Sequence, residues 1–253
     1  MKMTENMQLK KAVILAGGFG SRLKELTKTT PKPMLVLQDK KILEYAIDLC
    51  RRYGITEIAI SVHYLKEQII NYLGDGRKFG VKISYIEEEI PLGTAGAMRL
   101  AKDWLKEPFL MCNADELKDI NLQKMFEQHC ITGASATLAL TEVEDPSQYG
   151  VVELVGARIK RFVEKPKRED APSNWISAGL YIINPDVLKL VPEGFCMVEK
   201  QVFPQLAEEG KLYGLQFKGQ WFYTGTPERY ADAQANWKGF KENPLQDKRL
   251  FAK

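Results

Sequence analysis

The sequence predicts an α/β protein with a mostly parallel sheet flanked by helices. Short apolar runs suited to strands alternate with segments whose apolar residues recur at helical spacing. The first run, residues 11–16, is almost continuously apolar and stops at two glycines. A run of this kind is typical of a parallel strand that is buried on both faces. The order of strand, helix and strand therefore indicates βαβ units, in a Rossmann-like arrangement.

The first half of the chain supplies most of this pattern. After a loop that contains Pro31 and Pro33, an expected helix ends at Gly54, which is a C-cap signal. The expected helices are 42–53, 66–73, 95–105 and 122–130, and the strands that follow the first are 57–62, 82–87, 109–113 and 134–142.

The pattern changes from about residue 146. Runs 151–155 and 159–164 predict a hairpin that turns at Gly156, followed by a strand over 178–184 and a short helix over 185–190. We expect this mixed α+β portion to be largely antiparallel and to cover the active edge of the first sheet. The chain then forms one domain over 1–253, with halves at about 10–145 and 146–235. Residues 237–253 form a polar tail that packs as a helix and then frays.

Composition excludes several classes of function. The formal net charge is +3 without a block of Lys and Arg, so nucleic acid is not an expected partner. The chain has two histidines, and none of its four cysteines forms a CxxC pair, as in a protein with reduced core thiols. The first apolar run is too short for a signal peptide or a membrane span, which predicts a cytoplasmic protein without a membrane partner.

A glycine-rich loop, Gly17-Gly-Phe-Gly-Ser-Arg-Leu23, follows the first strand. It lacks the Gly-Lys-Ser/Thr end of a P-loop, and Leu23 stands where a dinucleotide-binding fingerprint needs Gly or Ala. The loop could be a plain structural turn. Arg22 favours phosphate binding instead, because a guanidinium can hold two phosphate oxygens.

Two further charged residues stand at positions suited to phosphate chemistry. Lys32 lies between two prolines that fix its direction, although a solvated lysine is the ordinary interpretation. Asp115 ends an apolar strand, where a parallel sheet binds its ligands. Its carboxylate could hold Mg²⁺ against phosphate oxygens, or it could simply cap the next helix.

The whole set of motifs resembles the sugar-nucleotide pyrophosphorylases, the sugar-1-phosphate nucleotidyltransferases, and looks most similar to mannose-1-phosphate guanylyltransferases. The resemblance covers roughly residues 10–235. The motifs that carry it, in order, are Leu15-Ala-Gly-Gly-Phe-Gly-Ser-Arg-Leu23, Pro31-Lys-Pro33, Pro91-Leu-Gly-Thr-Ala-Gly96, Asn113-Ala-Asp115, Tyr149-Gly-Val-Val152, Phe162-Val-Glu-Lys-Pro166, Ala178-Gly179 and Gly225-Thr-Pro227.

The resemblance implies a reaction that joins a sugar 1-phosphate to a nucleoside triphosphate and releases pyrophosphate. The implied catalytic residues are Arg22, Lys32, Asp115, as the Mg²⁺ ligand, and Lys165, which holds the sugar phosphate. The implied nucleotide-binding residues are Leu15, Ala16, Gly17, Gly18, Gly20, Glu88, Pro91, Gly93 and Thr94. The implied sugar-binding residues are Asn113, Gly150, Glu164, Ser177, Ala178, Gly179 and Glu199.

The sequence departs from the family pattern at two positions. Tyr223 stands where the family has a second metal-binding Asp, and a neutral phenol is a poor Mg²⁺ ligand. Ser177 stands where many relatives have Asn. A weakly active or inactive regulatory subunit that binds a sugar nucleotide therefore stays open as an alternative to an enzyme.

The nucleobase is predicted from Glu88. A carboxylate only accepts hydrogen bonds, and guanine offers paired donors, so we expect GTP to be preferred. A shift of one residue, to Glu87 or Glu89, or a thymidylyl- or uridylyltransferase, stays an alternative. The sequence fixes neither the sugar nor the oligomeric state, and a homo-oligomer is compatible with it.

Overall fold

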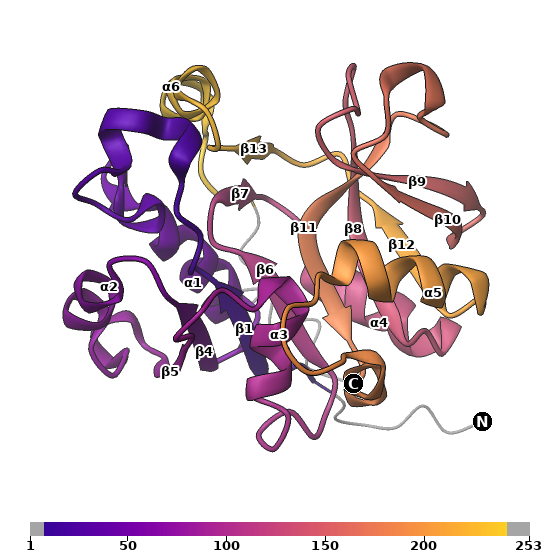
Figure 1. The fold of residues 1–253 in the computed structure, drawn as a ribbon, viewed down its shortest axis with the longest axis horizontal. Helices are drawn as coiled ribbons and strands as arrows, with labels where there is room; N and C mark the ends of the chain where they lie inside the picture. Colours follow the sequence, from indigo (N-terminus) through magenta and orange to yellow (C-terminus); the bar gives the residue numbers. More distant parts are fainter. Residues whose placement is uncertain (1–7, 242–253) are drawn as a thin grey trace.

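The computed structural model describes residues 8–241 and is built on one nine-stranded sheet (Figure 1). The strands follow the order β5-β4-β1-β6-β11-β8-β12-β10-β9 across the sheet. Their bounds are β1 Lys11–Leu15, β4 Glu57–Val62, β5 Lys82–Glu87, β6 Phe109–Asn113, β8 Ala136–Glu142, β9 Gly150–Val155, β10 Arg158–Glu164, β11 Trp175–Ile183 and β12 Leu212–Gln216.

The first four strands of this order are all parallel, as predicted. Their carboxyl ends meet at one edge, where Leu15 of β1 is in register with Ser61 of β4 and Asn113 of β6. Loops that leave these strands therefore start side by side. This edge is where an open parallel sheet places its ligands.

Helices cover both faces of the sheet, because alternate strand residues point in opposite directions. In β1, Ala12 and Ile14 belong to the core beneath α1, α2 and α4, whereas Val13 belongs to the core beneath α3 and α5. The helix bounds are α1 Ile42–Arg52, α2 Lys66–Leu73, α3 Gly93–Leu100, α4 Leu122–Thr132 and α5 Phe203–Glu208. The helix predicted over residues 95–105 is α3, which begins two residues earlier, at Gly93, and ends at Leu100. Residues 101–104 form a turn instead of continuing the helix.

The second half of the chain does not form a separate layer over the edge of the first sheet, as was expected, but extends the same sheet. Strand β11 is inserted antiparallel between β6 and β8, and the β9–β10 hairpin continues the same sheet at its far end. The unpaired edge of β6 would otherwise expose its backbone donors and acceptors, so pairing with β11 is favoured over stacking. Gly156 forms the hairpin turn as predicted, with a φ of 61°.

A small layer beside the main sheet was missed by the sequence pattern (Figure 1). Strands β7 (Glu116–Lys118) and β13 (Trp221–Tyr223) form a two-stranded antiparallel sheet, and α6 (Pro227–Asn236) follows β13. Both strands are only three residues long, which is too short for an alternating pattern to be recognised. The remaining short elements are η1 Ser21–Thr27, η2 Lys32–Met34, β2 Val36–Leu37, β3 Lys40–Lys41, η3 Arg77–Phe79, η4 Arg168–Asp170, η5 Pro185–Leu190 and η6 Val198–Val202.

The prediction of a polar helical tail from residue 237 is wrong for the part that the structure describes. The helix lies just before it, in α6, and residues 237–241 are not helical. Trp237 is buried against Tyr45, Phe222 and Phe240 because its large ring completes the core of this small layer. Residues 242–253 of the predicted tail lie outside the described part. Within residues 8–241, no helix has the length and apolar character needed to cross a bilayer.

Candidate active site

One cleft of about 450 Å³ opens at the carboxyl ends of the parallel strands. It brings together loops from both halves of the chain, which lie far apart in sequence. Of the predicted site residues, Ala178 does not line it, because its side chain is buried in the core. The predicted residues that do line it are Leu15, Ala16, Gly17, Gly18, Gly20, Arg22, Lys32, Glu88, Pro91, Gly93, Thr94, Asn113, Asp115, Gly150, Glu164, Lys165, Ser177, Gly179 and Glu199.

The glycine-rich loop runs from β1 into η1 along one wall of the cleft. Gly20 has a φ of 64°, and a Cβ atom there would lie 3.0 Å from the Cβ of Lys32 and 3.1 Å from the Cγ2 of Thr27. The loop therefore needs glycine for both its left-handed backbone and its contact with the Lys32 segment. Arg22, from this loop, and Lys32 both reach Tyr223 at the cleft.

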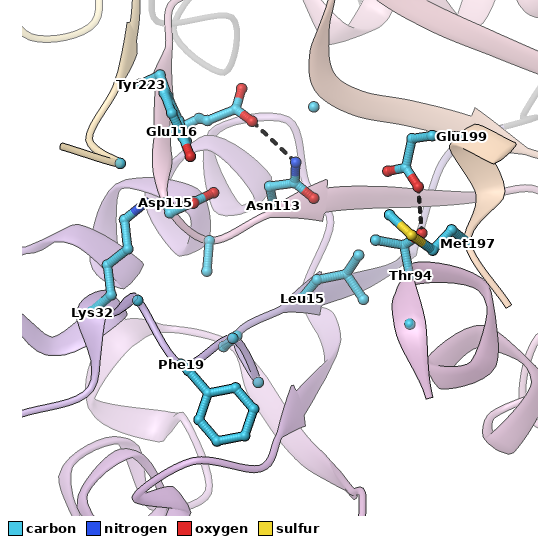
Figure 2. Close-up of a pocket in the computed structure, with 18 of the residues that line it drawn as sticks. Leu15, Phe19, Lys32, Thr94, Asn113, Asp115, Glu116, Met197, Glu199 and Tyr223 are labelled. Atoms are coloured by element: carbon cyan, nitrogen blue, oxygen red, sulfur yellow. Dashed lines mark hydrogen bonds and ion pairs between the residues drawn. The ribbon is translucent and has the colours of Figure 1, made fainter. Parts of the chain in front are cut away.

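Lys32 and Asp115 form an ion pair on the floor of the cleft (Figure 2). The Lys32 Nζ lies 2.5 Å from the Asp115 Oδ2, and the lysine side chain is only 7% exposed. Burial by itself raises the pKa of Asp115, but the charge and hydrogen bond of Lys32 outweigh it and hold that pKa below its ordinary value. Asp115 is therefore an anion that Lys32 already partly neutralises.

Tyr223 stands against this pair, at the end of β13. Its hydroxyl accepts a hydrogen bond from Arg22, and the Lys32 Nζ lies 4.6 Å from the centre of its ring. Burial, followed by the charge of Asp115, raises the pKa of Tyr223 to about 12, so the phenol is neutral at physiological pH. The backbone oxygen of Asp115 accepts hydrogen bonds from the Thr224 N–H at 3.1 Å and the Thr224 hydroxyl at 2.9 Å. The loop after β13 is thereby joined to the end of β6.

Glu116 is a buried carboxylate of the cleft that was not among the predicted site residues. It accepts hydrogen bonds from the Asn113 side-chain amide at 3.0 Å and the Trp221 indole at 2.8 Å. Gly179 passes so close that a Cβ atom there would lie 2.3 Å from the Glu116 Oε1, and its φ is 57°. This explains why glycine is required at that bulge of β11. The signal for Glu116 was its place directly after Asp115.

A second acidic group lines the opposite end of the cleft. Glu199, in η6, accepts a hydrogen bond of 2.6 Å from the Thr94 hydroxyl (Figure 2), and burial raises its pKa above the ordinary value. Glu164 is 12% exposed and lies 3.3 Å from the Nζ of the half-exposed Lys165. These carboxylates can accept hydrogen bonds from hydroxyl groups, and Lys165 adds a cation at their edge.

Glu88 lines the cleft on the side of β4. Its carboxylate accepts hydrogen bonds from the Ser61 hydroxyl and from the Leu92 N–H, the latter at 2.8 Å. The ring of His63 contacts the Glu88 backbone oxygen at 2.8 Å. Ser61 and His63 were missed, although both are polar and lie at the end of a buried strand.

The charges are divided along the cleft. Arg22 and Lys32 lie on the side of the glycine-rich loop, where Lys32 pairs with Asp115. Glu164 and Glu199 line the cleft toward η6. Such an arrangement can bind phosphate groups at one end and a hydroxyl-rich group at the other. Across residues 8–241, no three His, Cys, Asp or Glu side chains gather into a metal-binding group.

Comparison with known proteins points to one family. A sequence model described as nucleotidyl transferase matches residues 11–238. A relative in Oryza sativa subsp. japonica, named as a probable mannose-1-phosphate guanylyltransferase 2, is 38% identical over 227 residues. That match covers 87% of this chain and 62% of the relative, so the chain spans less than two thirds of the relative's length.

Solved structures have the same fold. A putative glucose-1-phosphate thymidylyltransferase from Bacillus anthracis superposes with a TM-score of 0.83 at 25% identity, covering 92% of this chain and 98% of that one. A UDP-glucose pyrophosphorylase in complex with UDP-glucose superposes with a TM-score of 0.76 at 27% identity, covering 90% and 98%. The α/β class predicted from the sequence is confirmed by these neighbours.

The ion pair at the cleft predicts a pH-dependent effect on stability. Replacing Lys32 with Met should cost about 2 kcal/mol at neutral pH, less than the roughly 3–5 kcal/mol of a fully buried pair, because Asp115 is 29% exposed. The pKa of Asp115 is lower in the folded protein than its ordinary value of 3.8, so the ionised carboxylate stabilises the folded state of wild type. This contribution is fully present above pH 3.8 and is lost as the pH falls through the pKa of Asp115 in the folded protein. The stability difference between wild type and variant should therefore shrink below about pH 4.

Urea unfolding of both proteins between pH 7 and pH 2.5 measures this difference. Lys28→Met is a matched control, because its pair with Glu25 is 67% and 79% exposed and should contribute little at any pH. A Lys32→Met cost that stays constant across the whole range would contradict the assignment of the pair.

Proposed function

Since the chain belongs to the nucleotidyl transferase family, we propose that it is a sugar-1-phosphate nucleotidyltransferase that releases pyrophosphate. The nucleoside triphosphate is GTP and the sugar 1-phosphate is that of a hexose such as mannose. Support comes from the relative in rice, whose name gives mannose 1-phosphate and a guanylyl group. Structural neighbours named for thymidylyl transfer and for UDP-glucose support the wider reaction class.

One observation carries the proposal: Arg22, Lys32, Asp115 and Lys165, which are spread over more than 140 positions of sequence, all line a single cleft. Both substrates are anions that repel each other. Cations fixed in advance at the place where they meet lower this repulsion without reorganising during the reaction.

The roles follow from the charges along the cleft. Arg22 and Lys32 hold the leaving pyrophosphate beside the glycine-rich loop, and Lys165 holds the phosphate of the sugar. Glu164 and Glu199 accept hydrogen bonds from sugar hydroxyls. A sugar phosphate oxygen attacks the α-phosphorus, and the bond from that phosphorus to the bridging oxygen of pyrophosphate breaks. This direct displacement needs no covalent enzyme intermediate.

Mg²⁺ fits this cleft through Asp115. The ion commonly binds proteins through one or two carboxylates and keeps several waters and phosphate oxygens as its other ligands. Bound there, it would neutralise charge that develops on the phosphates. Tyr223 is not a ligand of the Mg²⁺ ion, because its phenol is neutral at physiological pH and Mg²⁺ prefers carboxylate and phosphate oxygens.

Substitution of the cations tests the phosphate roles. Arg22→Ala and Lys32→Ala should each lower kcat by about 10²-fold or more, the scale for one preorganised electrostatic contact. Lys165→Ala should mainly raise the KM for sugar 1-phosphate. A coupled assay of pyrophosphate release measures all three. Tight binding of a sugar nucleotide without pyrophosphate release by wild type would instead support a regulatory subunit.

The metal role is tested by binding rather than by turnover. Asp115→Asn should weaken Mn²⁺ binding in the presence of GTP by roughly tenfold or more, because one ionised ligand is lost. Electron paramagnetic resonance of Mn²⁺, used as a substitute for Mg²⁺, reports the free ion directly. Asp186→Asn, outside the cleft, serves as the control. Unchanged affinity in Asp115→Asn would place the metal elsewhere.

The base preference is tested with four nucleotides. Glu88 offers only acceptors, so kcat/KM should be highest with GTP and should fall at least about tenfold in Glu88→Gln, since an amide donor meets the donors of guanine. The matched controls are Glu87→Gln, at the end of β5, and Glu89→Gln, in the loop that follows it. Faster turnover with dTTP or UTP than with GTP would refute this part of the proposal.

A further inference from the structure

Arg229 is a charged residue beside the cleft to which the proposed reaction gives no role. It lies in the first turn of α6, whose N-cap is the Thr226 side chain. Its guanidinium carbon lies 5.1 Å from the centre of the Tyr149 ring and 5.4 Å from that of the Tyr223 ring. Both of these rings line the cleft. Arg229 is thus held where the two aromatic walls meet.

The surroundings of Tyr223 hold an excess of positive charge. Besides Arg229, the Arg22 guanidinium carbon lies 5.6 Å and the Lys32 Nζ 4.6 Å from the centre of its ring. Asp115 pairs with Lys32, but none of the ion pairs in residues 8–241 includes Arg22 or Arg229. Within residues 8–241, Asp115 is therefore the one carboxylate that forms an ion pair with any of these three cations.

The nearby acidic groups do not remove this excess. Asp145 feels the charge of Arg229, but its pKa is lowered first by hydrogen bonds from Ser147 and only to a lesser extent by Arg168 and Arg229. Glu116, opposite Tyr223 in the β7–β13 pair, accepts hydrogen bonds from Asn113 and Trp221, and its Oε2 lies 3.7 Å from the Nζ of the buried Lys118. Arg22 and Arg229 both approach one neutral phenol without a carboxylate partner of their own in the described part of the chain, so an anion bound between them would be attracted by both charges.

The position of Arg229 lies between the two proposed phosphate sites. Tyr223 accepts a hydrogen bond from Arg22, which belongs to the glycine-rich loop. Tyr149 accepts through its backbone oxygen a hydrogen bond of 2.9 Å from the Lys165 N–H, which belongs to the sugar-phosphate side. Cation–π contacts with two rings that meet at 78° hold the guanidinium of Arg229 in place, and such a group can donate hydrogen bonds to phosphate oxygens.

We propose that Arg229 is a further phosphoryl-binding residue of this cleft, and that Tyr149 and Tyr223 are its positioning residues. This inference rests on the proposed function for the identity of the phosphate ligands. It also gives Tyr223 a role: the phenol gathers Arg22, Lys32 and Arg229 around the reacting phosphates, so that protein cations supply charge neutralisation next to Asp115.

Phosphate binding without metal tests the inference. Full-length wild type, Arg229→Gln and Arg229→Lys are titrated by calorimetry with pyrophosphate and, separately, with mannose 1-phosphate, all in EDTA. Arg229→Gln should weaken at least one of the two ligands by roughly tenfold or more, the scale for one charge-assisted hydrogen bond. Arg229→Lys keeps the charge but loses the planar fork, so its loss should be smaller.

The two ligands distinguish the two sources of the phosphoryl group. A loss confined to pyrophosphate assigns Arg229 to the leaving group, and a loss confined to mannose 1-phosphate assigns it to the sugar substrate. Arg77→Gln is the matched control, because the Arg77 side chain is 89% exposed and lies beside β5, away from the cleft. This variant should bind both ligands with the affinity of wild type. Thermal unfolding of each variant checks that α6 stays folded.

Two results would overturn the inference. The first is that wild type binds neither pyrophosphate nor mannose 1-phosphate. The second is that Arg229→Gln binds both ligands with affinities within about twofold of those of wild type. The proposed function fails by a different measurement, namely wild type that binds these phosphates as expected but releases no pyrophosphate from any pair of nucleotide and sugar 1-phosphate.

Discussion

The ion pair between Lys32 and Asp115 ties together the parts from which the cleft is made. Lys32 comes from the loop after β1 and Asp115 from the end of β6, and the Asp115 backbone oxygen also accepts two hydrogen bonds from Thr224 beyond β13. Three segments of the chain are thereby fixed around one carboxylate. Because a charge taken out of water is costly without its partner, each segment constrains the others.

Close backbone contacts make this assembly possible. Gly20 lets the glycine-rich loop contact the Lys32 segment, and Gly179 lets β11 pass against Glu116 and Asn113. Both glycines have a positive φ, so their place in the chain is required by conformation as well as by space. The cleft is therefore shaped by backbone positions at least as much as by its charged side chains.

The departure at Tyr223 has a structural meaning that the sequence did not reveal. Taken alone, a phenol in place of a carboxylate indicates a lost metal ligand. In the structure, the same phenol is the centre of a group of cations from η1, η2 and α6. Tyr223 cannot bind a metal ion as a carboxylate would, but Arg22, Lys32 and Arg229 around it are cations that can neutralise phosphate charge.

The amino-acid sequence predicted the parallel half of the sheet and many, but not all, of the residues that line the cleft, because buried strands and glycine-rich loops leave local patterns in the chain. It could not place β11 in the same sheet, since the pairing partner of a strand depends on which edges remain open after the other strands have paired. Nor could it reveal β7 and β13, which are too short for periodicity, or the burial of Trp237, which depends on Tyr45 and Phe222. Tertiary structure alone joined Glu116 to Trp221, 105 positions away, and Arg229 to Tyr149, 80 positions away. Local sequence carries no signal for such contacts, and they form only when the whole chain is packed.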